Sequence, residues 1–154
     1  AITPLISNEH LLTLYGTSVY IGTPTFRHAI GTNNFVQNGR PTGWYKGSDS
    51  QDIMVGLNYF YFNNLRISTT VGFFKSGEEN ILYRIFDPYK DYIEGPFPSG
   101  QIEESIYIDT YFQYWWKPYL SIQSGFNWSN SFTNNHILEL RLGVQFYNYF
   151  SFNL

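Results

Sequence analysis

Residues 138–154, LELRLGVQFYNYFSFNL, decide the fold class of this chain. Every second residue from Leu138 to Phe146 is apolar. The residues between them are polar or small: Glu139, Arg141, Gly143 and Gln145. Because successive side chains leave a strand on opposite sides, this period of two predicts an extended strand with one apolar and one polar face.

The stretch is also longer than an ordinary strand. Strands of globular proteins usually run about 5 to 6 residues, whereas a strand that crosses a bilayer at a tilt needs about 9 to 11. Charged residues alternating with leucines are typical of a strand with lipid on one side and a watery lumen on the other. We therefore predict a membrane-crossing strand. The alternative is a long edge strand of a soluble sandwich or of a lipocalin-like barrel.

The end of the stretch resembles the terminal strand of bacterial outer-membrane barrels. Their assembly signal is an alternating apolar and aromatic end, usually closed by an aromatic residue. Here the last residue is Leu154, and Phe152 stands two positions before it. The resemblance implies that this strand closes a barrel.

The composition favours the membrane class. The chain has 154 residues, of which 21% are aromatic and only 14% charged, with no cysteine and a formal charge of -3. Average soluble domains carry about 25% charged residues. No run of about 18 apolar residues is present, which excludes a transmembrane helix. The weakly acidic balance argues against a nucleic-acid partner.

The same alternation recurs along the chain and predicts strands over residues 11–22, 51–61, 65–75, 103–115, 119–128 and 138–154. Two tight turns, Phe62–Asn64 and Trp116–Pro118, alternate with longer loops, of which 23–50 and 76–102 are the longest. The predicted fold class is all-β, an antiparallel transmembrane outer-membrane β-barrel that forms one domain over residues 1–154.

Pairing arguments predict which side of each strand faces outward. In each of the two tight hairpins, the apolar residues of both strands lie on the same face only if the numbers of two residues paired across the strands have an even sum. A three-residue turn satisfies this rule by placing Tyr61 opposite Leu65. The predicted outward set is Ile53, Val55, Leu57, Tyr59, Tyr61, Leu65, Ile67, Thr69, Val71, Phe73, Ile106, Ile108, Thr110, Phe112, Tyr114, Leu120, Ile122, Ser124, Phe126 and Trp128. The outward face of strand 11–22 stays open.

The loop lengths predict an orientation. Membrane barrels have short periplasmic turns and long external loops. The two tight turns are therefore expected in the periplasm, as is the carboxy terminus, with the protein in the bacterial outer membrane. Aromatic residues gather near the tight turns, where an interfacial girdle would lie: Tyr59, Tyr61, Trp115, Trp116 and Tyr119.

Six strands are too few for a barrel, because the smallest single-chain membrane barrels have about eight. Either several chains share one barrel, or the chain is the carboxy-terminal part of a longer protein. We favour the second interpretation, since residue 1 begins without the basic and apolar blocks of a signal peptide.

Four charged residues are expected to face the lumen: Arg66, Asp109, Glu139 and Arg141. They could pair across the barrel wall to hold its shape, or they could select which solutes pass. Pairing is the commoner arrangement.

The loop 23–50 carries the candidate binding residues Arg40, Trp44, Tyr45 and Asp49. Aromatic ring faces stack on the apolar faces of sugars, and charged groups bond sugar hydroxyls and acids. This combination predicts a polysaccharide-binding surface. Alternatively, the aromatic residues fold the loop down as a lid.

No enzymatic activity, metal site or cofactor is predicted. His10, His28 and His136 share no close ligand spacing. The carboxylate pairs Glu78–Glu79 and Glu103–Glu104 lie at loop and strand borders and have the pattern of solvated charge.

A family resemblance rests on residues 39–57, GRPTGWYKGSDSQDIMVGL. A Gly-Arg pair, a following Gly and a Gly-x-Asp precede a strand: Gly39, Arg40, Gly43, Gly47 and Asp49. This pattern resembles capsule-assembly (Wzi-like) outer-membrane proteins. The resemblance implies a Gram-negative barrel that attaches capsular or exopolysaccharide to the cell, with lipid, polysaccharide and other outer-membrane or periplasmic proteins as partners. The alternatives are a porin-like pore, a barrel subunit of a transport or secretion complex, and an outer-membrane enzyme.

Overall fold

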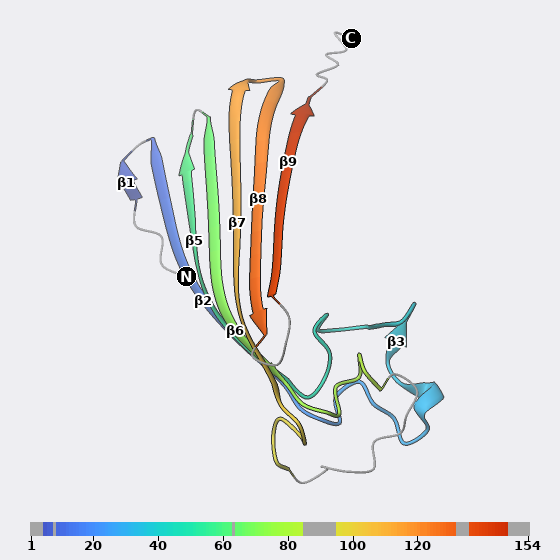
Figure 1. The fold of residues 1–154 in the computed structure, drawn as a ribbon. Coiled ribbons are helices and arrows are strands. Elements are labelled where there is room, and N and C mark those ends of the chain that lie inside the picture. Colours follow the sequence, from blue (N-terminus) through green and yellow to red (C-terminus); the bar gives the residue numbers. More distant parts are fainter. Residues whose placement is uncertain (1–4, 8, 63, 85–94, 132–135, 148–154) are drawn as a thin grey trace.

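The computed structural model describes residues 5–7, 9–62, 64–84, 95–131 and 136–147, which form an all-β fold (Figure 1). The long strands are β2 (His10–Ile21), β5 (Ser50–Tyr61), β6 (Leu65–Ser76), β7 (Glu103–Lys117), β8 (Leu120–Ser131) and β9 (His136–Phe146). The short elements are β1 (Leu5–Ser7), the 3-10 turn η1 (Gly31–Asn33), β3 (Val36–Gln37) and β4 (Arg40–Pro41).

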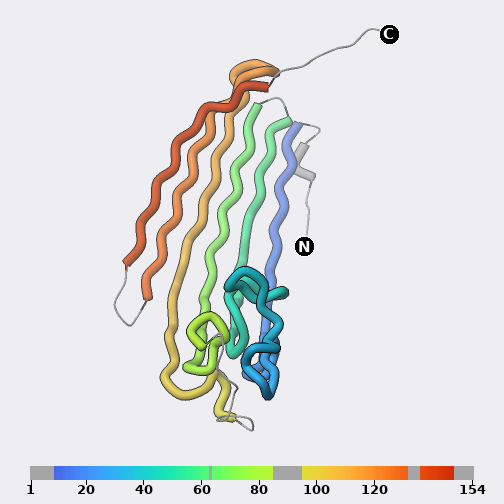
Figure 2. Tube along the Cα trace, turned by 90° about the vertical axis from the view of Figure 1, so that its right-hand side faces the viewer, coloured from blue at the N-terminus to red at the C-terminus, as the bar shows by residue number. Residues whose placement is uncertain are grey.

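The long strands lie side by side in one antiparallel sheet with the order β1-β2-β5-β6-β7-β8-β9 (Figure 2). Strands β3 and β4 form a separate small hairpin within the first long loop. The six predicted strands are therefore confirmed, whereas β1, β3 and β4 were not predicted. The sheet is open over the described residues, because no strand there pairs with the outer edge of β9.

The pairing brings the predicted outward residues onto one face. Tyr61 pairs with Leu65, as the even-sum rule requires. One row across the sheet consists of Val55, Val71, Ile108, Trp128 and Leu138. The structure also answers the open question of strand β2, because Leu14 pairs with Leu57 of the outward set. Leu12, Leu14, Gly16, Ser18 and Tyr20 thus share the apolar face.

The turn between β7 and β8 differs from the predicted Trp116–Pro118 turn. Strand β7 continues to Lys117, which pairs with Leu120, and the ladder shifts between Trp115 and Lys117. The connection is thus a two-residue turn next to a bulge. The extra residue in the bulge keeps the apolar side chains of both strands on the same face, so the predicted faces are correct although the turn is not.

The end of the predicted strand 138–154 lies mostly outside the described residues. Strand β9 ends at Phe146, and Tyr147 follows it without strand pairing. Residues 148–154, which carry the expected assembly signal, are not among those described.

Two tyrosines lie flat across glycines on the polar face of the sheet. The Tyr107 ring covers Gly72, and the Tyr15 ring covers Gly56, so that a Cβ at either glycine would overlap a ring. Each hydroxyl then reaches the strand beyond. Tyr107 donates to Asp52 on β5 at 3.0 Å, and the Tyr15 hydroxyl lies 2.8 Å from that of Thr70 on β6.

The described long strands form a single sheet, and the burial pattern reflects the lack of a second layer over it among the described residues. Among the described residues Ile81 is the only buried large apolar side chain, whereas the buried polar residues are many and gather near the long loops. Apolar side chains instead line the outward face, as at Val55, which is 61% exposed, and Leu142, which is 77% exposed. In the described part of the chain, no helix is long and apolar enough to cross a membrane.

Candidate functional site

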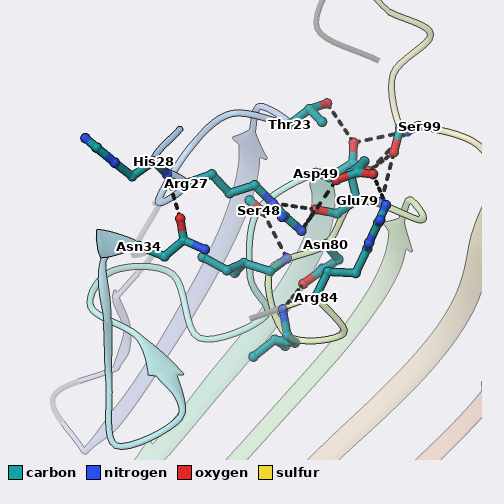
Figure 3. Close-up of polar contacts among 12 residues, drawn as sticks. Thr23, Arg27, His28, Asn34, Ser48, Asp49, Glu79, Asn80, Arg84 and Ser99 are labelled. Atoms are coloured by element: carbon teal, nitrogen blue, oxygen red, sulfur yellow. Dashed lines mark hydrogen bonds and ion pairs between the residues drawn. The ribbon is translucent and has the colours of Figure 1, made fainter. Parts of the chain in front are cut away.

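Three loop segments meet around the carboxylate of Asp49, at the end of the sheet where the long loops gather (Figures 2 and 3). Thr23 donates its hydroxyl to Asp49 Oδ1 at 3.0 Å. The backbone N–H of Ser99 donates to the same oxygen at 3.0 Å, and the Ser99 hydroxyl donates to Oδ2. The Asp49 carbonyl accepts from the N–H of Gly77 at 2.9 Å. Segments of the two long loops are therefore joined through one buried residue.

A second buried cluster, centred on Glu79, extends this joint (Figure 3). Arg27 donates from Nη2 to the Glu79 carbonyl at 2.7 Å, and its guanidinium lies 3.6 Å from the Glu79 carboxylate. Arg84 donates to Oε1 of the same carboxylate. The Arg27 and Glu79 side chains are 0% and 1% exposed. A buried charge needs such partners, because removing them would leave it desolvated and uncompensated.

These contacts define the loop joint, which consists of Thr23, Arg27, Ser48, Asp49, Glu79, Arg84 and Ser99. Ser48 contributes by accepting from the N–H of Ile81 at 3.1 Å. The loops thus form an ordered structure that is built mainly from polar contacts.

The predicted binding residues fall into separate places. Asp49 is 0% exposed and belongs to the loop joint, so its carboxylate presents no surface to a ligand. Arg40 is exposed on β4 and lines a shallow hollow with Gln37, Asn38, Pro41 and Thr42. The structure therefore does not gather the predicted residues into one surface.

Trp44 and Tyr45 do lie together. Their ring centroids are 4.9 Å apart with the planes inclined by 55°. Tyr45 is 67% exposed, whereas the Trp44 Nε1 is buried and has no hydrogen-bond partner among the described residues. This pair is the part of the predicted binding surface that presents an aromatic face to solvent.

Lys46 fastens the same segment to the polar face of the sheet. Its ammonium lies 2.7 Å from Asp52 Oδ2, on the strand that follows the loop. It also lies over the rings of Tyr107 and Phe74, at 4.1 and 4.6 Å from their centroids. Asn80 holds the backbone by donating to the Lys46 carbonyl at 2.9 Å. Sequence reasoning missed this fastening, although Asp52 begins a strand with its side chain on the polar face.

A hollow of about 340 Å³ lies between this segment and the sheet. Its lining residues are Tyr45, Lys46, Phe74, Ser105, Tyr107, Asp109, Asn127 and Ser129. Burial raises the pKa of Tyr45, and the carboxylates of Asp52 and Asp109 raise it further. The Tyr45 phenol therefore stays protonated at neutral pH and can donate a hydrogen bond. We call this space the Tyr45 hollow.

The four charged residues predicted for the lumen all lie on the polar face. Arg141 donates to Glu139 from Nε at 2.8 Å and from Nη2, so these two pair along one strand and not across strands. Asp109 accepts from Asn127 Nδ2 at 3.2 Å. Arg66 lies over the ring of Phe60 at 5.3 Å.

A second hollow of about 350 Å³ adjoins the first, since both are lined by Asp109 and Asn127. It extends along β8 and β9 to Glu139 and Arg141. Gly143, on its lining, has open space above its Cα, because an added Cβ would meet no atom within 4 Å.

Comparison with known proteins adds no relative. No protein-family model, curated protein or solved structure matches the chain. Within the described residues, no group of three or more His, Cys, Asp and Glu side chains could hold a metal ion. The resemblance to capsule-assembly proteins stays a prediction.

Proposed function

We propose that this chain forms wall strands of a bacterial outer-membrane β-barrel, and that the external loop end binds surface polysaccharide. The observation that carries the first part is the outward face. Its apolar side chains run in rows across β5 to β9, and those with more than a third of their surface exposed include at least one on each of these strands, such as Val55, Val71, Phe112, Ile122 and Leu142. Soluble monomers rarely expose apolar patches larger than about 300 to 600 Å², so a face of this kind calls for an apolar cover.

A lipid cover would also explain the length of the strands and the polar character of the opposite face. Strands β2, β5, β6 and β8 have 12 residues each, and β9 has 11. A tilted transmembrane strand needs about 9 to 11. The opposite face carries charged side chains of the strands, and some of its buried groups, such as Asp52, bond to neighbouring side chains, as expected in a barrel with a hydrated interior. A soluble sandwich would instead need a second sheet over the apolar face.

The ends of the sheet support the proposed orientation. Near the short turns, aromatic side chains such as Phe62, Trp116 and Tyr119 are exposed. Such residues favour the boundary between lipid and water. The described parts of the long loops, which are joined by polar contacts, lie at the other end, which in outer-membrane barrels faces outside.

Polysaccharide binding is supported by the loop end itself. Tyr45 offers an exposed ring above a hollow that contains hydroxyl, amide and carboxylate groups. The Gly-Arg and Gly-x-Asp pattern that resembles capsule-assembly proteins lies in the same loop. The loop joint would keep this surface in a fixed shape, which lowers the entropy lost on binding.

The membrane assignment can be tested on single-cysteine variants, since the chain has no cysteine of its own. Leu140→Cys and Leu142→Cys place a thiol on the apolar face, and Arg141→Cys and Gly143→Cys place one on the polar face. After nitroxide labelling in lipid vesicles, electron paramagnetic resonance should show oxygen access at the first pair and access of a water-soluble nickel chelate at the second. Equal nickel access at all four positions would contradict a lipid-facing wall.

The binding assignment can be tested on a glycan array. The protein folded in detergent micelles should retain surface polysaccharide fragments, and Tyr45→Ala should weaken retention. Phe35→Ala is a matched control, because Phe35 is a similarly exposed aromatic residue of the same loop. Equal retention by both variants would mean that Tyr45 is not part of the binding surface.

A pore is the second candidate, and the polar row across the sheet favours it. Gly56, Thr70, Asp109, Asn127 and Glu139 stand in one row and include two carboxylates. Conductance in planar bilayers separates the candidates. A binding protein whose loops fold over the polar face should pass little current, whereas a pore should pass cations in preference to anions.

A further inference from the structure

We propose that the Tyr45 hollow is a subsite for an uncharged sugar ring, with Tyr45 as its stacking platform and Asp109 as its principal hydroxyl-binding group. This inference rests on the proposed function, since it assumes that the loop end binds polysaccharide. It goes further by naming the residues and the class of sugar.

The walls of the hollow suit a sugar face. Tyr45 stands on the loop side and is the exposed ring, while Tyr107 and Phe74 line the sheet side with the Lys46 ammonium over their rings, so that the stacking face is that of Tyr45. The position of Tyr107 is fixed, because its ring lies on Gly72 and its hydroxyl donates to Asp52. Rigid aromatic rings gain contact with the apolar face of a sugar at little entropic cost.

The polar groups of the hollow can bond several sugar hydroxyls. Asn127 Nδ2 donates to one oxygen of the Asp109 carboxylate, Oδ2, at 3.2 Å. The other oxygen, Oδ1, has no hydrogen-bond partner among the described residues and can accept from a hydroxyl. Ser105 and Ser129 line the same wall and can both donate and accept. A volume of about 340 Å³ lies at the small end of the range for ligand pockets, about 300 to 1,000 Å³.

The charges of the hollow argue for an uncharged ring over an acidic one. The positive charge of Lys46 is already balanced by Asp52 at 2.7 Å. The remaining charge is the carboxylate of Asp109, which is exposed to the hollow. A uronic acid placed here would bring a second carboxylate beside it, and like charges placed together disfavour binding.

The adjoining hollow indicates the direction in which a glycan bound at Tyr45 would extend. It shares Asp109 and Asn127 with the Tyr45 hollow and continues along β8 and β9. A sugar bound at Tyr45 can therefore extend past Asp109 and Asn127 toward Gly143, where the space above the Cα is open.

The test is calorimetric titration of the protein folded in detergent micelles. The probes are the neutral trisaccharides isomaltotriose, cellotriose and mannotriose, and acidic trigalacturonate. We expect a neutral probe to bind and trigalacturonate to bind more weakly. Asp109→Asn, which keeps the size of the side chain, should lower the affinity for the neutral probe roughly tenfold. Hydrogen bonds to a charged acceptor are about twice as strong as neutral ones.

Phe35→Ala is the control, since Phe35 is exposed in the same loop and does not line the Tyr45 hollow, and Arg40→Ala tests the separate hollow that Arg40 lines. Binding that survives Asp109→Asn and Tyr45→Ala but is lost with Arg40→Ala would overturn this inference and leave polysaccharide binding in place. Preference for trigalacturonate would overturn the class of sugar. If none of these probes binds but the wild-type chain retains other glycans on the array, the subsite is wrong. If the array too retains nothing, the proposed polysaccharide function itself fails.

Discussion

Asp49 shows how one side chain fixes the external loops. Its backbone adopts a left-handed conformation with φ of 52°, and its buried carboxylate binds Thr23 and Ser99. We expect Asp49→Ala to destabilise the packed arrangement of the loops by about 3 to 5 kcal/mol, because the buried hydrogen-bond donors of Thr23 and Ser99 lose their acceptor. Limited proteolysis should then cut residues 77–84 and 95–102 faster. Arg40→Ala, an exposed substitution, should leave the cleavage rate unchanged, and an equal rate in both variants would refute the role of Asp49.

The sequence could not reveal that Asp49 is buried. A charged residue near Trp44 and Tyr45 in a long loop has the pattern of a binding residue, and its position along the chain is compatible with that role. Its true partner, Ser99, lies 50 residues away. Glu79 was predicted to be a solvated charge, and this prediction is wrong, because Glu79 is buried against Arg27. The two residues are 52 apart, and only the folding of two long loops brings them together.

At Gly72, the space that a side chain would fill is taken by the ring of Tyr107. Gly72→Ala should displace the Tyr107 ring and break its hydrogen bond to Asp52, at a cost of about 1 to 3 kcal/mol. Gly143→Ala is the matched control on the same face, because nothing lies within 4 Å of its added Cβ. Replacing that strand glycine should be neutral or stabilise by up to about 1 kcal/mol. Urea unfolding in micelles measures both, and similar shifts would contradict the packing of Tyr107 on Gly72.

At the scale of elements, the sequence predicted the faces of the strands more reliably than their pairing. The alternation of apolar residues in β7 and β8 is enough to say which side chains share a face. It does not fix the register, because a three-residue turn and a two-residue turn with a bulge both keep the apolar sets together. Strand β2 has Leu and Tyr on both faces, so only its pairing with β5 shows its outward side.

Strand β9 allows the sharpest comparison between neighbouring positions. Leu142 lies near the middle of the apolar face, and Gly143 lies next to it on the polar face. Leu142→Arg should destabilise the inserted protein by about 2 to 4 kcal/mol, the cost of an arginine at the bilayer midplane. Gly143→Arg points its charge toward the polar side and should cost much less. Urea unfolding from lipid vesicles measures the difference, and equal costs would exclude a lipid-facing Leu142.

At the scale of the whole molecule, composition and alternation together predicted the all-β class, which the structure confirms, and a closed barrel, which stays a prediction. Closure depends on which strand meets the edge of β9. That contact is not encoded by any local pattern within residues 136–147. The described strands form an open sheet, and closure around a lumen belongs to the proposal.

The last prediction concerns the outer edge of β9, which pairs with no strand among the described residues. A strand edge in lipid would leave N–H and C=O groups without partners, each at a cost of several kcal/mol. If the proposal is correct, a further strand, from this polypeptide or from another copy, must pair with β9. Hydrogen exchange of the protein assembled in native-like membranes should then be slow at every amide from Leu138 to Phe146, as it should be along the central strand β6.

The contrary result has a distinct signature. In an antiparallel pair, alternate amides of an edge strand bond to the neighbour and the others point away. Fast exchange at every second amide of β9, with uniformly slow exchange along β6, would mean that β9 is a true edge. The barrel proposal would then fail, and the apolar face would require a protein cover in place of lipid.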